Sequence, residues 1–93
     1  MRDITKQSVA ALMAGRDYKN GNTQVTDGAL WLHKTPIVEM RHDGMYIQTG
    51  GWNTSTTKER LNGLMSVRVY THKHQLYLNG QPWDGEWIKV RDI

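Results

Sequence analysis

The chain of 93 residues contains no cysteine and no phenylalanine, and it has only two prolines. Without cysteine, neither a disulfide framework nor a thiolate metal site is available, which fits a reducing compartment. Without phenylalanine, the four Trp, four Tyr and five Met residues must supply most of the bulky packing. The hydrophobic fraction of 38% is low for a chain of this size, which is near the lower limit for folding on one core. We therefore expect a single domain over residues 1–93.

Long apolar runs are absent as well, because none approaches the roughly 20 residues that span a bilayer. The first residues also lack the apolar region of a secretory signal. We therefore expect a cytoplasmic protein with no membrane contact. The net charge is +3, but Lys and Arg are spread along the chain without the basic block that is typical of a nucleic-acid-binding arm.

Turn dipeptides separate short segments in which apolar and polar residues alternate. Asp27-Gly28, Asp43-Gly44 and Asn79-Gly80 each predict a tight hairpin turn. A first helix is predicted over residues 4–14, with Asp3 as its cap and Gly15 as its stop. The predicted strands cover residues 23–26, 29–33, 37–41, 45–48, 67–72, 75–78 and 86–90, and Ile37 falls on the polar side of its strand.

These elements predict an α+β fold with small antiparallel sheets. Their order is helix, four short strands, short helix, three short strands. The expected segments are an N-terminal helix in residues 1–15, a first meander in 22–49, a GGW loop and helix in 50–65, and a second meander in 66–91.

The connection over residues 50–65 is expected to hold a short helix. Thr56 stands three residues before Glu59, which is the spacing of a capping box, and Asn62-Gly63 is a natural stop. Lys58 and Arg60 would then be free for a partner. The hydroxyl-rich start of this helix could also bind a small anionic ligand such as a nucleotide, but structural capping explains the same residues.

The predicted strands have one aliphatic face and one aromatic and basic face. The second face carries Trp31, His33, Arg68, Tyr70, Tyr77 and Trp87, together with Arg41 and Tyr46. Trp, Tyr and Arg are enriched among the anchoring residues of protein interfaces, and aromatic rings among cations also suit the stacking of nucleic-acid bases. The same rings could instead cover a second small core.

No catalytic group of nucleophile, base and orienting residue can be assembled from the sequence, so we expect no enzyme and no cofactor. His72 and His74 would share a face of a continuous strand, but no carboxylate follows at a useful spacing. The sequence therefore predicts no metal site.

Several strings resemble a family of small phage and prophage proteins of unknown function. They are Leu30-Trp31-Leu32-His33, Gly50-Gly51-Trp52, Thr56-Thr57-Lys58-Glu59-Arg60-Leu61-Asn62, Tyr77-Leu78-Asn79-Gly80 and Trp83-Asp84-Gly85-Glu86-Trp87. Lys34 departs from the family pattern, in which Gly often follows the His.

The resemblance implies a phage origin and no defined activity. Because small accessory phage proteins commonly bind host or defence components, we expect a non-enzymatic binding module that acts in host takeover or counter-defence in the host cytoplasm. A host or defence protein is the favoured partner. Nucleic-acid binding is the first alternative, and a homodimer through exposed sheet edges is a further expectation.

Overall fold

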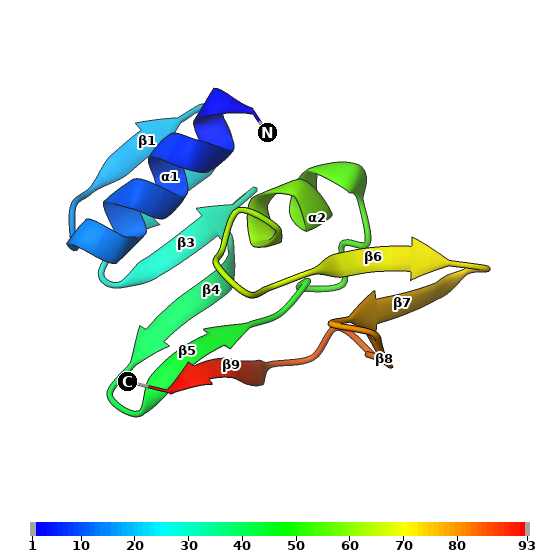
Figure 1. The fold of residues 1–93 in the computed structure, drawn as a ribbon. Coiled ribbons are helices and arrows are strands. Elements are labelled where there is room, and N and C mark those ends of the chain that lie inside the picture. The colour runs from blue at the N-terminus through cyan, green and yellow to red at the C-terminus, as the bar shows by residue number, and fades with distance from the viewer. Residues whose placement is uncertain (1, 93) are drawn as a thin grey trace.

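The computed structural model describes residues 2–92, which form two helices and nine strands in two antiparallel sheets (Figure 1). The helices are α1 (Asp3–Ala14) and α2 (Ser55–Leu61). The strands are β1 (Tyr18–Asn20), β2 (Thr23–Thr26), β3 (Ala29–Leu32), β4 (Thr35–Arg41), β5 (Gly44–Ile47), β6 (Val69–His72), β7 (Gln75–Leu78), β8 (Gln81–Pro82) and β9 (Ile88–Asp92). The predicted α+β class is confirmed.

α1 ends at Ala14 as predicted, but it begins one residue earlier than predicted. Arg2 is the N-cap and makes no side-chain cap bond, so Asp3 is the first helical residue and not the cap. Gly15 ends the helix at φ 69°, a left-handed conformation that Gly adopts at no steric cost. α1 lies across β1, β2 and β3 (Figure 1).

The larger sheet has the order β1-β2-β3-β4-β5-β9. The segment between the first helix and β2, where the sequence predicted no strand, forms β1, which pairs with β2. Between β3 and β4 the register shifts, because Leu30 pairs with Val38 whereas Trp31 pairs with Pro36. Ile37 is the extra residue of this bulge, and a bulge re-aims the side chains around it. Ile37 and Val38 are therefore both buried, and the expectation that Ile37 lies on the polar side is wrong.

The last strand belongs to this sheet and not to the second meander in which the sequence placed it. β9 pairs with β5, while the smaller sheet has the order β6-β7-β8. The chain returns to the larger sheet at Gly85, whose carbonyl accepts a 2.9 Å hydrogen bond from the N–H of Thr49, just beyond β5. Trp83 fixes the same loop, because its buried indole donates to the carbonyl of Glu86 at 2.9 Å.

One hydrophobic core joins both sheets and both helices. Its buried residues include Leu12 of α1, Leu61 of α2, and strand residues of each sheet. The strand residues are Val25, Leu30, Leu32, Ile37, Val38, Met45, Ile47, Val69, Leu76 and Leu78. The aliphatic face that the sequence predicted is therefore the core.

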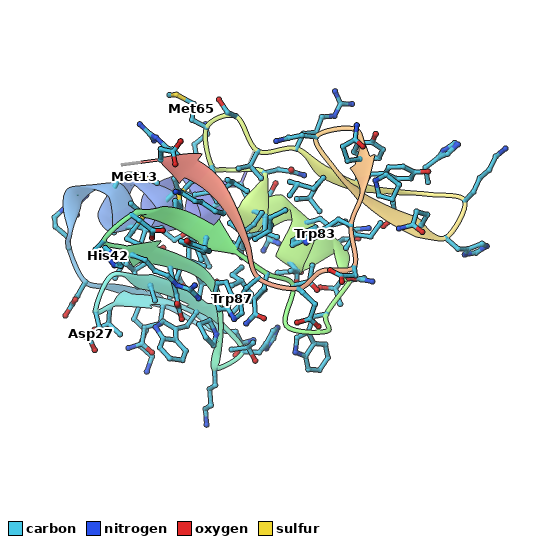
Figure 2. All side chains as sticks on the ribbon, turned by 90° about the horizontal axis from the view of Figure 1, so that it is seen from below. Met13, Asp27, His42, Met65, Trp83 and Trp87 are labelled. Carbon is cyan, nitrogen blue, oxygen red and sulfur yellow. The ribbon has the colours of Figure 1, made fainter. Side chains whose placement is uncertain are left out.

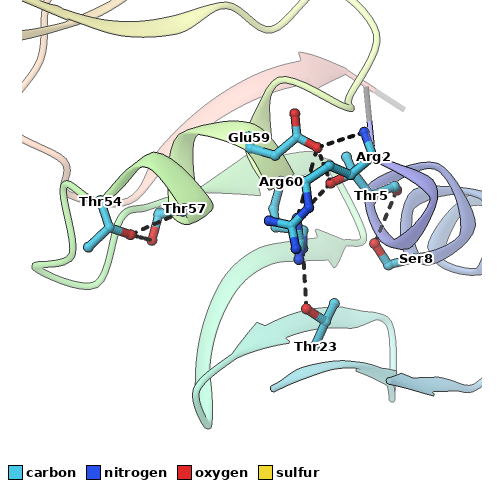
Figure 3. Close-up of polar contacts among 8 residues, drawn as sticks. All are labelled: Arg2, Thr5, Ser8, Thr23, Thr54, Thr57, Glu59 and Arg60. Carbon is cyan, nitrogen blue, oxygen red and sulfur yellow. Dashed lines mark hydrogen bonds and ion pairs between the residues drawn. The ribbon is translucent and has the colours of Figure 1, made fainter. Parts of the chain in front are cut away.

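The N-cap of the short helix α2 lies two residues before the one that the capping box predicted. Thr54 is the N-cap, and its hydroxyl accepts a 3.2 Å bond from the N–H of Thr57. Glu59 does not reach back to a cap. Its carboxylate accepts a 2.5 Å bond from the hydroxyl of Thr5 and a 3.2 Å bond from the N–H of Arg2, and so ties α2 to the start of α1 (Figure 3).

Arg60 is buried, with only 2% of the residue exposed, so the expectation that it is free for a partner is wrong. Its guanidinium donates to the hydroxyl of Thr5 at 2.7 Å and to that of Thr23 at 3.2 Å (Figure 3). These bonds connect α2 to α1 and to β2. Lys58 is only partly exposed, and its ammonium donates to the hydroxyl of Thr71 at 3.0 Å.

The stability that Glu59 provides is expected to depend on pH. Burial favours a raised pKa for this carboxyl, but the hydrogen bonds from Thr5 and Arg2 and the charge of Arg60 outweigh burial and lower the pKa. Because the pKa is lower in the folded state, the stabilisation is present above the unfolded pKa and is lost as pH falls through the folded one.

In urea unfolding, Glu59→Gln should therefore be less stable than the wild type at neutral pH. The difference should shrink as pH falls below about 4. A difference that stays constant between neutral and acid pH would contradict this role of the charge.

Candidate functional site

The aromatic and basic residues expected on one face are divided between the two sheets. Trp31, His33 and Trp87 belong to the larger sheet and its turns, whereas Arg68, Tyr70 and Tyr77 belong to the β6–β7 hairpin or its entry. The division arises because β6 does not continue the first sheet. The structure therefore presents two candidate surfaces in place of one.

The first candidate surface is the outer face of the larger sheet, on the side away from the core. Side chains alternate between the two faces of a strand, so the neighbours of buried residues point outward. The register brings Gln24 next to Trp31, Glu39 next to Tyr46, and Tyr46 next to Lys89. Both helices bury residues of the opposite, aliphatic face. We call this outward surface the outer face. Its residues are Gln24, Trp31, Glu39, Arg41, Tyr46, Trp87 and Lys89.

Arg41 lies between two aromatic rings of the outer face. Its guanidinium carbon is 4.1 Å from the ring centre of Tyr46 and 5.0 Å from that of Trp87. Trp87 is the last residue of the loop that leads into β9 (Figure 2). Arg41 also donates a 3.0 Å bond to the carboxylate of Glu39. Cation–π contacts and an ion pair therefore hold these side chains in one place before any partner arrives.

Charges of both signs alternate along this end of the outer face. The hydroxyl of Tyr46 donates to Asp43 at 2.8 Å, which lowers the pKa of Asp43 and raises the pKa of Tyr46. The ammonium of Lys89 lies 2.6 Å from Asp92 and 3.8 Å from Asp43. The hydrogen bond to Asp92 is the main cause of the raised pKa of Lys89. These cations are thus largely neutralised by neighbouring carboxylates.

A small cavity of about 120 Å³ opens beside Trp31 at the other end of the outer face. The indole N–H of Trp31 is buried and has no hydrogen-bond partner among the described residues. A buried donor without a partner costs about 1–3 kcal/mol. Lys19, Gln24, His33 and Lys34 line the cavity, and no carboxylate does.

Sequence reasoning missed this cavity because it predicted no strand between residues 14 and 23. The pairing of β1 with β2 brings Lys19 next to Gln24, and so to the cavity. The available signal was Gly21-Asn22, a dipeptide typical of two-residue hairpin turns. Trp52 was also overlooked as a surface residue; it is 51% exposed, and its ring centre lies 6.3 Å from that of His33.

The second candidate surface is the β6–β7 hairpin, which extends away from α1 and the larger sheet (Figure 1). Tyr70 and Tyr77 are opposite each other in the register, and their rings stack with centres 5.3 Å apart and planes 11° apart. Arg68 lies over the ring of Tyr70, with its guanidinium carbon 5.6 Å from the ring centre. His72, Lys73 and His74 are exposed at the tip.

The start of α2 has little left with which to bind an anion. The hydroxyls of Thr54 and Thr57 lie 3.1 Å apart and bond to each other, and Arg60 points into the interior. For metals, residues 2–92 hold no group of three or more His, Cys, Asp or Glu side chains that could bind an ion.

The family model described as Kyanoviridae Gp96 protein matches residues 1–91 of this chain. No curated protein and no solved structure matches it. Within the described part of the chain, neither helix has the length and apolar character needed to cross a membrane.

Proposed function

The chain belongs to the Kyanoviridae Gp96 protein family, which is phage-encoded, and from this premise we propose that it is a non-enzymatic binding module. It contacts a host or defence protein in the host cytoplasm through the outer face of the larger sheet. The observation that carries the proposal is the buried indole N–H of Trp31, which has no partner among the described residues and belongs to a side chain that lines a cavity at that face. A carbonyl or carboxylate of a bound protein would supply the missing acceptor once a flexible lining side chain moves aside.

The residue types on the outer face support a protein partner. Trp31, Tyr46 and Trp87 provide large rigid rings, and Arg41 is already held between two of them. Anchors that are ordered before binding lose less conformational entropy on association. The helices leave this face open while they cover the other.

The charges on the outer face favour a protein over a nucleic acid as its partner. Arg41 pairs with Glu39, and Lys89 pairs with Asp43 and Asp92. Carboxylates among the cations repel a phosphate backbone, whereas mixed charges can match complementary charges on a protein.

Homodimerisation through a sheet edge fits less well. β1 and β9 are the edges of the larger sheet. Antiparallel pairing of two β9 strands about Val90 would place Lys89 opposite Arg91, and like charges directly opposite are destabilising. Cationic side chains on edge strands commonly prevent such pairing.

Photo-crosslinking in phage-infected host cells tests the proposal. A benzophenone amino acid at Gln24, which is exposed on the outer face beside Trp31, should give an adduct of defined mass with one host or defence protein. Trp87→Ala in the same chain should reduce that adduct severalfold, because Trp87 is one of the proposed anchors.

The control places the same crosslinker at Ala10, which is exposed on α1. No matching adduct is expected there. The proposal fails if Gln24 gives no adduct, if Ala10 gives the same one, or if Trp87→Ala leaves the yield unchanged while the protein remains folded.

A further inference from the structure

The net positive charge of the chain comes from one segment. Residues 60–83 contain three of the 12 Lys and Arg residues and none of the nine Asp and Glu residues, so nine of each sign are left elsewhere. The net charge of +3 is therefore the charge of this segment. Lys and Arg are spread along the chain, as the sequence suggested, but the carboxylates are not.

Most of this segment is the β6–β7 hairpin with its flanks, and two of its three cations face solvent. Arg60 is buried, whereas Arg68 and Lys73 are exposed. Arg68 immediately precedes the hairpin, and Lys73 is at its tip. A polyanion that approached these two cations would meet no carboxylate of the hairpin itself.

The outward side of the hairpin combines these cations with two stacked rings. Residues 68, 70 and 72 share one side of β6 because strand side chains alternate. Tyr70 stacks on Tyr77 of β7, and the guanidinium of Arg68 lies over Tyr70. Both tyrosines are partly exposed. Aromatic rings next to exposed cations form the kind of platform on which unpaired bases stack while their phosphates meet the charges.

The turn at the tip holds its cation in an unfavourable conformation. Lys73 and His74 have φ values of 49° and 67°, which are left-handed; Gly, Asn, Asp and His adopt this conformation more readily than Lys does. Asn-Gly is the preferred sequence for such a turn, and this chain has it at Asn79-Gly80, with φ values of 50° and 86°. Replacing Lys73 and His74 with that sequence should therefore relieve strain at the tip.

We propose that the β6–β7 hairpin binds single-stranded nucleic acid. Tyr70 and Tyr77 stack on bases, and Arg68 and Lys73 contact phosphates. This site is separate from the outer face and goes beyond the proposed function. An acidic protein is the competing occupant, but the exposed cations and the stacked rings of the hairpin together match the phosphates and bases of a single strand. A duplex keeps its bases stacked inside and cannot use the rings in this way.

The binding is tested by fluorescence anisotropy with a labelled oligothymidylate of about 12 nucleotides. The salt concentration runs from about 20 to 200 mM. Two phosphate contacts predict a slope of about −1.4 for the logarithm of the binding constant against that of salt, since single strands give roughly −0.7 per contact. A duplex of the same length should bind more weakly. No binding at the lowest salt concentration overturns the proposal.

The tip is tested with a variant that should not unfold the hairpin. Lys73→Asn with His74→Gly introduces the preferred turn sequence, so the thermal midpoint should rise while affinity falls. The salt slope should become less negative by about 0.7. The matched control is His33→Asn with Lys34→Gly, because that two-residue turn has φ values of 51° and 67° and carries the same residue types. The control should leave oligonucleotide affinity unchanged, and equal losses in both variants overturn the assignment to the hairpin.

The rings are tested with Tyr70→Thr and Tyr77→Thr together, since Thr retains a preference for strands. This variant should lose oligonucleotide affinity by at least about 30-fold, because each of the two rings contributes the stacking of one base. Inorganic polyphosphate, a polyanion without bases, should bind the wild type and the variant with equal affinity. If the oligonucleotide binds the variant as it binds the wild type, the hairpin recognises negative charge alone, and the proposal of single-stranded nucleic acid is wrong.

Discussion

Replacing Arg60 with Ala is expected to lower the free energy of unfolding by about 3–5 kcal/mol. Domains of this kind have a total of roughly 5–15 kcal/mol, so the variant should be partly unfolded near physiological temperature. The loss is large because Arg60 joins three elements. Its guanidinium bonds to Thr5 of α1 and Thr23 of β2, and lies 3.9 Å from the carboxylate of Glu59.

Removal of the side chain takes a hydrogen-bond donor from the hydroxyls of Thr5 and Thr23, although Thr5 keeps its bond to Glu59. Thr5 and Thr23 are almost completely buried, with 0% and 1% exposed, so water cannot readily replace the lost donor. Burial lowers the pKa of Arg60 from its ordinary value. An arginine nevertheless stays charged over the whole accessible pH range. The remaining cavity adds to the loss of packing.

Urea unfolding of Arg60→Ala beside Lys58→Ala provides the measurement and its control. Lys58 lies on the same helix, but its single bond is to the exposed Thr71, so its loss should be about 1 kcal/mol or less. If Arg60→Ala destabilises the protein no more than Lys58→Ala does, the bonds from α2 to α1 and β2 do not hold the fold together.

Replacing Gly44 with Ala is expected to lower the free energy of unfolding by about 3 kcal/mol and to loosen β9 selectively. Gly44 is buried at the start of β5, opposite Asp92 of β9. A Cβ atom built there overlaps the backbone carbonyl oxygen of Arg91, and it comes 2.7 Å from Cε of Lys89. The lysine can move, but the carbonyl can move only if the strand is displaced.

Amide hydrogen exchange after the substitution should show faster exchange in β9 than in β2 and β3. The control is Gly21→Ala, where φ is also positive at 58° but no atom lies within 4 Å of the added Cβ. The free energy of unfolding of this variant should fall by only about 1–2 kcal/mol, which is the cost of a left-handed conformation for Ala. Equal stability losses in the two variants would show that β9 does not pack against Gly44 as described.

Local signals were enough to predict the first helix and several turns. Gly15 ends α1 in the expected left-handed conformation, and Asp27-Gly28 and Asn79-Gly80 form two-residue turns with positive φ. Each feature depends on a few neighbouring residues, whose conformational preferences act within one turn of chain. The α+β class follows from the same alternation and turn signals.

The capping of α2 shows where a local pattern misled. The Thr56–Glu59 spacing matched a capping box, but Glu59 bonds to Thr5, which is 54 residues away in sequence. Thr54 caps the helix instead. Several hydroxyls of this stretch could cap the helix. Because α1 lies close by, the Glu59 carboxylate bonds to α1 and not to a cap.

The amino-acid sequence by itself determined most of the elements of this protein, the absence of cysteine chemistry, and the excess of cations over carboxylates. Only the tertiary structure decided that β9 crosses to β5, that Arg60 is buried, and that the aromatic residues form two surfaces. The physical reason is distance along the chain. Propensities and turns act between neighbours, whereas strand order and the burial of a charge depend on contacts between residues far apart in sequence, such as Thr49 with Gly85 and Thr5 with Arg60.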